Sequence, residues 1–229
     1  MDQLHYCIPD FEVAEFAHRK VMDEIKMVMT AFDCVLPDNS AIYCSSDVTT
    51  GLRFYERLVV HQVRSRDELE NKIGVAKAKE EVAGIIRENI ERGREFTENI
   101  RQRGHINLIN PGPFTAPDFE QQHYHYLWEW VIVKKVYEIQ FNEGWEYSNG
   151  CTLEYAIATK KRIPRLDHVG NFIDLDEAIS KIERALAELS KHAIQASMLE
   201  KNLAALRVLL LEIEEEETLG NAAKSLASF

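Results

Sequence analysis

Short apolar runs alternate with amphipathic stretches along most of this chain. The apolar runs lie at 41–45, 105–109, 136–141 and 162–166, and each has the length of a buried strand. Between them, apolar residues recur at helical spacing, most regularly over 121–135. Strands that alternate with helices pair in parallel. The pattern therefore predicts an α/β fold with a three-layer, Rossmann- or flavodoxin-like parallel sheet.

Helices are expected at both ends of this core. The first covers 11–33, and the second covers 191–217, where apolar residues recur at alternating spacings of four and three: Leu199, Leu203, Leu206, Leu210 and Ile213. We therefore divide the chain into an N-terminal helical extension (1–40), an α/β core (41–190) and a C-terminal helix (191–229). The apolar seam must be buried, either against the first helix or against a second copy of the chain.

The segment 67–103 follows a shorter expected helix at 52–63 and has helical propensity throughout. A continuous helix of that length would be about 55 Å long. Glycines interrupt it at Gly74, Gly84 and Gly93. We therefore expect at least one break.

Composition and charge restrict the class of protein. The 229 residues are 45% hydrophobic and 28% charged, as in ordinary globular proteins, and the net charge of −11 argues against binding a nucleic-acid polymer. No apolar run approaches the roughly 20 residues that cross a bilayer, and the first residues lack the features of a signal peptide. The four cysteines form no C-x-x-C pair, so we expect reduced thiols and a cytoplasmic protein without membrane partners.

A polar loop at 43–51 follows the first predicted strand and precedes a helix. Its hydroxyls and free N–H groups could hold a phosphate or a sugar, or it could be an ordinary turn in which Ser or Thr caps the helix. Asp47 could orient a ribose hydroxyl or cap the loop, and Arg53 could approach a phosphate. Neither G-x-x-x-x-G-K-[ST] nor G-x-G-x-x-G occurs, so an ATPase or a dinucleotide oxidoreductase is not supported.

A second polar loop, 144–150, follows the third predicted strand and leads into a helix that carries Glu154. This carboxylate is either a partner of the helix dipole or a reacting group. Trp145 could stack on a base or lie in the core. Cys151 is better explained by packing than as a nucleophile. His123 and His125 have no further suitably spaced ligand, so no metal is expected.

Two blocks resemble the nucleoside 2-deoxyribosyltransferase-like superfamily, which includes the deoxynucleoside 5′-monophosphate N-glycosidases. The first is 42–51 with Tyr55-Glu56-Arg57 after it, similar to the opening strand and substrate loop of that family. The second is 144–158, which contains the family signature S-x-G-x-x-x-E-x-x-x-A beginning at Ser148. Between them, 104–111 is similar to the family's second strand. The resemblance covers roughly residues 41–187.

The resemblance implies cleavage or exchange of the N-glycosidic bond of a nucleoside or nucleoside 5′-monophosphate. Glu154 would be the nucleophile, and no metal or organic cofactor would be needed. The remaining residues that it implies would hold the base, the sugar and the 5′ end of the substrate: Tyr43, Ser46, Asp47, Thr50, Gly51, Arg53, Trp145, Ser148 and Gly150. Related enzymes complete their sites with a neighbouring subunit, so a homo-oligomer, most simply a dimer, is also implied.

One position departs from the family pattern. The family usually has an aspartate, which protonates or positions the leaving base, at the entrance to the third strand. That position holds Tyr137 here, with Glu138 next to it on the opposite side of a strand. Two alternatives therefore stay open. The protein could be a catalytically inactive, nucleotide-binding sensor, or an enzyme similar to NAD glycohydrolases.

Overall fold

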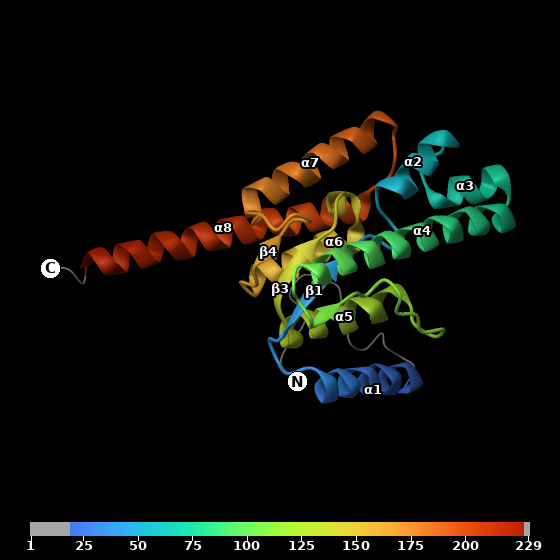
Figure 1. Cartoon of the computed structure of the whole chain (residues 1–229). Coiled ribbons are helices and arrows are strands. Elements are labelled where there is room, and N and C mark those ends of the chain that lie inside the picture. The colour runs from blue at the N-terminus through green and yellow to red at the C-terminus, as the bar shows by residue number, and fades with distance from the viewer. Residues whose placement is uncertain (1–18, 227–229) are drawn as a thin grey trace.

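The structure, a computed structural model, describes residues 19–226 of the chain. Its centre is a four-stranded, all-parallel sheet in the order β2-β1-β3-β4. The strands are β1 (Ala41–Ser45), β2 (Leu108–Ile109), β3 (Val136–Phe141) and β4 (Arg165–Leu166). Helices flank the sheet (Figure 1), so the expected α/β class is confirmed.

The helices follow the predicted order along the chain. They are α1 (Arg19–Val35), α2 (Leu52–Val60), α3 (Arg66–Ile73), α4 (Val75–Gln102), α5 (Gln121–Lys135), the 3₁₀ turn η2 (Trp145–Tyr147), α6 (Asn149–Lys160), α7 (Leu175–Lys191) and α8 (Ser197–Leu226). No helix in this part of the chain is both long enough and apolar enough to cross a bilayer.

Alternate residues of β1 contact different helical layers. Ile42 and Cys44 pack with Phe96 and Ile100 of α4. Tyr43, which points to the opposite face, belongs to the larger core that α5, α6, α7 and α8 also form. Strand β1 is therefore buried on both faces, as expected for a central parallel strand.

The long helical segment breaks at only one of its three glycines. Gly74 has a φ of 86° and separates α3 from α4, whereas Gly84 and Gly93 lie inside α4. At Gly93, an added Cβ would lie only 3.3 Å from the Cβ of Ser46. The missing side chain at Gly93 thus allows α4 to approach the loop after β1 closely.

The C-terminal helix α8 does not stand apart from the core. Its first turns pack on α6 and α7, and they bury Leu199, Leu203 and Leu206. The side-chain amide of Asn202 donates hydrogen bonds to Thr152 Oγ1 (2.8 Å) and to a backbone carbonyl of α6 (3.0 Å). The alternative in which this seam packs against the first helix is wrong for the described residues, because α1 packs on α5 instead. Farther along, α8 extends away from the body of the protein (Figure 1).

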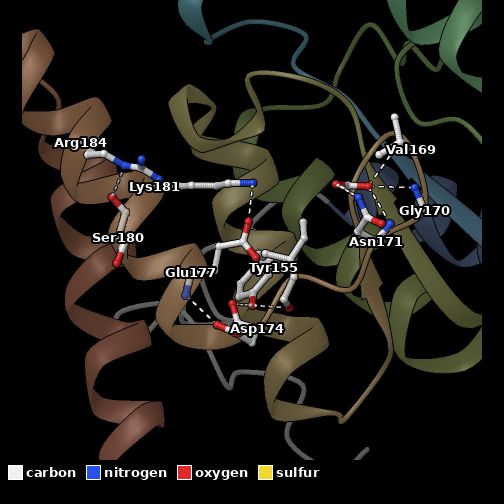
Figure 2. Close-up of polar contacts among 11 residues, drawn as sticks. Tyr155, Val169, Gly170, Asn171, Asp174, Glu177, Ser180, Lys181 and Arg184 are labelled. Atoms are coloured by element: carbon white, nitrogen blue, oxygen red, sulfur yellow. Dashed lines mark hydrogen bonds and ion pairs between the residues drawn. The ribbon is translucent and has the colours of Figure 1, made fainter.

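Polar contacts hold the segment between α6 and α7 in place (Figure 2). The hydroxyl of Tyr155, on α6, donates to the backbone carbonyls of Ile173 (3.1 Å) and Asp174 (2.8 Å). Asp174 in turn caps α7 by accepting a hydrogen bond from the N–H of Glu177 (2.7 Å). These contacts connect the helix that carries Glu154 to the rest of the core.

Candidate functional site

A cavity of about 400 Å³ lies where the carboxyl ends of the strands meet. Its walls come from the segments that follow β1 (46–50), β2 (111–115) and β3 (148–154), together with α5 and parts of α4 and α8. This edge is where open parallel sheets place their ligands, because the first turns of the following helices also face it.

The carboxylate of Glu154 lines this cavity, and both of its oxygens accept hydrogen bonds from β1. The hydroxyl of Tyr43 donates to Oε1 at 2.6 Å, and the hydroxyl of Ser45 donates to Oε2 at 2.6 Å. Tyr43 and Ser45 are two residues apart, so they point to the same face of the strand. The carboxylate is therefore fixed by groups on a rigid, buried element.

Burial raises the pKa of Glu154 to about 7, while the hydrogen bonds from Ser45 and Tyr43 lower it. Desolvation disfavours the charged form of a carboxyl group, whereas donated hydrogen bonds favour it. The group is consequently divided between its acid and carboxylate forms at neutral pH. A weakly solvated carboxylate of this kind is suited to act as a nucleophile or a general base.

Two polar loops meet at the start of α6. The backbone N–H of Asn149 donates to Thr50 Oγ1 at 3.1 Å, and Ser148 caps the helix by accepting from the N–H of Cys151 at 3.4 Å. Thr50, Ser148 and Gly150, three of the residues predicted to bind substrate, all line the cavity. The loop after β1 is thus attached directly to the helix that carries Glu154.

Two buried polar atoms of the lining residues have no hydrogen-bond partner in the described part of the chain. They are Ser46 Oγ and Asn149 Oδ1. A buried polar atom without a partner costs roughly 1–3 kcal/mol. A bound polar ligand could supply the missing hydrogen bonds, so this part of the cavity has the character of a binding site.

One face of α5 also lines the cavity. It presents Gln121, Tyr124, His125 and Trp128, which follow the helical spacing i, i+3, i+4, i+7. Phe114, from the loop after β2, packs edge-on against Trp128 with ring centroids 5.5 Å apart. From the sequence, His125 was predicted only as a possible metal ligand and Gln121 was not predicted at all, although their helical spacing places both on this face.

Five residues predicted to bind substrate do not line the cavity. Tyr43 is fully buried, and its hydroxyl donates to Glu154 instead of facing a ligand. Trp145 is only 3% exposed and stacks on Tyr155 with centroids 5.0 Å apart, so it belongs to the core and not to a base-binding surface. Arg53 donates to Glu88 at 2.6 Å on the exterior. The other two, Asp47 and Gly51, belong to the loop after β1 and lie close to each other.

Asp47 is buried, and its carboxylate lies 3.7 Å from the guanidinium of Arg92. An added Cβ at Gly51, where φ is 143°, would lie only 2.4 Å from Asp47 Oδ2. Burial raises the pKa of Asp47, and Arg92 lowers it. Asp47 therefore packs within the loop after β1, and it is not among the residues that line the cavity.

The position of the family aspartate is also outside the cavity. Tyr137 is 41% exposed, and Glu138 accepts a hydrogen bond from the side-chain amide of Gln140 at 2.7 Å. Neither residue lines the cavity.

No protein-family model matches the chain, and neither curated proteins nor solved structures give a significant match. No group of three or more His, Cys, Asp or Glu side chains within residues 19–226 is arranged to hold a metal ion. The fold and the site together define an α/β protein with a hydroxyl-bound carboxylate in a cavity at the carboxyl edge of a parallel sheet.

Proposed function

We propose that this protein cleaves or exchanges the N-glycosidic bond of a nucleoside or a nucleoside 5′-monophosphate, with Glu154 as the nucleophile. The observation that carries the proposal is the fixed carboxylate, which accepts a hydroxyl hydrogen bond on each oxygen at 2.6 Å inside a cavity of ligand size. The sequence resemblance gives this carboxylate the same role.

The reaction would proceed in two displacements at the anomeric carbon. Ionised Glu154 forms a bond to that carbon, and the electron pair of the glycosidic bond leaves with the base. Water, or a second base, then attacks the same carbon and regenerates the carboxylate. Tyr43 and Ser45 are positioning residues, because they restrict the orientation of both carboxylate oxygens.

The two kinds of cavity wall fit the two parts of such a substrate. The aromatic wall, which includes Phe114 and Trp128, offers flat apolar surface to a base. The polar segments around Thr50 and Ser148 offer hydroxyls and amides to the sugar. The N-terminus of α6 would receive the 5′-hydroxyl or the 5′-phosphate.

We also propose that the protein forms a homodimer through the outer part of α8. Val208 and Leu211 are 54% and 59% exposed on this helix. Leu210 and Ile213 are only partly covered by the core. Apolar surface that continues along a projecting helix is typical of an interface between chains.

The alternative is a nucleotide-binding sensor without turnover. It is favoured by one observation, namely that Tyr137 and Glu138 leave no carboxylate at the usual leaving-group position. A sensor would use the same cavity and would bind the same ligands. Binding without release of base separates this alternative from the enzyme.

The test is release of free base from a panel of nucleosides, their 5′-monophosphates and NAD, followed by chromatography. Glu154→Gln should abolish release and leave ligand binding within about tenfold, because a nucleophile acts mainly in the transition state. Glu80→Gln is the matched control, since Glu80 is exposed on α4 and is not part of the cavity lining. Undiminished release by Glu154→Gln would refute the assignment.

A further inference from the structure

The wall formed by α5 begins beside the proposed nucleophile. Trp128 packs edge-on against Tyr43 with centroids 6.2 Å apart, and Tyr43 donates to the carboxylate of Glu154. His125 lies three residues before Trp128 on the same helical face and lines the same cavity. A base joined to an anomeric carbon at Glu154 would therefore extend along this face toward His125.

His125 makes one hydrogen bond to a neighbouring side chain on this wall. The side-chain amide nitrogen of Gln121 lies 2.9 Å from its Nε2. In the neutral tautomer whose Nε2 accepts from this amide, the ring proton resides on Nδ1. Burial lowers the pKa of His125 to about 4, which keeps the ring neutral near pH 7. The Nδ1–H group is then a neutral donor with no other hydrogen bond in the described chain.

The other titratable side chains that line the cavity are less suited to donate a hydrogen bond to a base. The hydroxyl of Tyr124 donates to the carbonyl of Ala116 (3.2 Å) and accepts from its N–H (3.0 Å). Burial raises the pKa of Cys151 well above its usual value, so its thiol stays protonated at neutral pH and remains a weak donor. Glu154 is the nucleophile. His125 is the remaining titratable donor on the base side of the cavity.

We infer that His125, oriented by Gln121, contacts the leaving base and donates a hydrogen bond to it as the glycosidic bond breaks. The inference rests on the proposed function and assigns a leaving-group contact that Tyr137 and Glu138 do not supply. As the bond from Glu154 to the anomeric carbon forms, the electron pair of the glycosidic bond passes to the base. The Nδ1–H group stabilises the developing negative charge. Water then protonates the released base, and the imidazole is unchanged.

The test compares two substrates that differ in how much negative charge develops on the leaving base. A purine nucleoside or its 5′-monophosphate leaves with negative charge, whereas its N7-methylated counterpart leaves as a neutral base. His125→Ala should lower kcat/KM for the ordinary purine by about a hundredfold or more, the usual effect of losing a donor to developing charge. For the N7-methylated substrate we expect a loss below about fivefold, since little charge develops on its base.

His125→Asn keeps an N–H donor near the position of Nδ1 and should stay within about tenfold of the wild type on both substrates. If the alanine variant does not fold, a loss of more than about tenfold in His125→Asn on either substrate overturns the inference. His192→Ala, at the exposed C-terminus of α7, is the matched control and should change neither rate. Equal losses on both substrates, or no loss, in His125→Ala would overturn the inference alone. Absence of base release by the wild type would overturn the proposed function as well.

Discussion

The hydroxyl of Tyr43 lies 2.6 Å from Oε1 of Glu154, although the two residues are 111 positions apart in the chain. Tyr43 is fully buried on β1, and Glu154 lies in the second turn of α6. Burial raises the pKa of Tyr43 well above its usual value, so it remains a protonated donor at physiological pH. The central strand thus holds a carboxylate whose own pKa is raised by the same burial.

Base release should increase as the pH rises through about 7. The nucleophile must be ionised, and burial places the pKa of Glu154 at about 7. At pH 5 nearly all of the enzyme carries the protonated, inactive acid. The measurement is kcat/KM from pH 5 to pH 9 on one substrate. A rate independent of pH below 7 would contradict this prediction.

Tyr43→Phe should lower kcat/KM by about tenfold to a hundredfold, the rate equivalent of a hydrogen bond to a charged group. The same change should move the acid limb of the pH profile upward, because the hydrogen bond from Tyr43 lowers the pKa of Glu154. Ser45→Ala should act in the same direction through Oε2. A lower rate with an unmoved pH profile would indicate a packing defect instead of lost carboxylate control.

Glu154→Gln should make the folded protein more stable at high pH. The pKa of Glu154 is raised from 4.5 to about 7 in the folded state, so this state binds the proton more tightly than the unfolded state does. The stability of the wild type therefore falls between those two pH values, and the variant avoids a loss of at most about 3 kcal/mol. Urea unfolding at pH 4.5 and pH 8 measures the difference, which should appear only at pH 8. Glu80→Gln serves as the control.

The α8 interface predicts that the wild type has the mass of two chains by light scattering at micromolar concentration. Leu211→Glu places a charge on its exposed outer part and should yield a monomer with unchanged unfolding free energy per chain. Leu203→Ala should instead destabilise each chain by about 2–5 kcal/mol, because Leu203 is buried against the core. A monomeric wild type would refute the dimer.

A strand could be predicted from the sequence where its apolar run fits only one kind of structure. The strand at 41–45 was correct because both faces of a central parallel strand are apolar. The second strand was predicted at 105–109, but only Leu108–Ile109 pairs, and Ile106 is 84% exposed. Apolar residues alone do not show which of them receives a partner strand.

The site could be predicted only in part for a similar physical reason. The loop residues Thr50 and Ser148 line the cavity because the loops that follow parallel strands meet at the carboxyl edge of the sheet. Trp145 was misassigned, since an aromatic residue after a strand can face either a ligand or the core. The contacts of His125 and of the α8 seam depend on how the helices pack against one another. An apolar stripe predicts that one face of a helix is buried, but not which element covers it.

The proposed function depends most directly on a covalent bond between Glu154 and the sugar. A nucleoside with a 2′-fluorinated sugar, whose electron-withdrawing substituent slows the second displacement, should trap that intermediate. Intact-mass spectrometry followed by peptide mapping should find one sugar added to the peptide that contains Glu154, and none in Glu154→Gln. Base release without a sugar on Glu154, or a sugar attached to another residue, would contradict the claim.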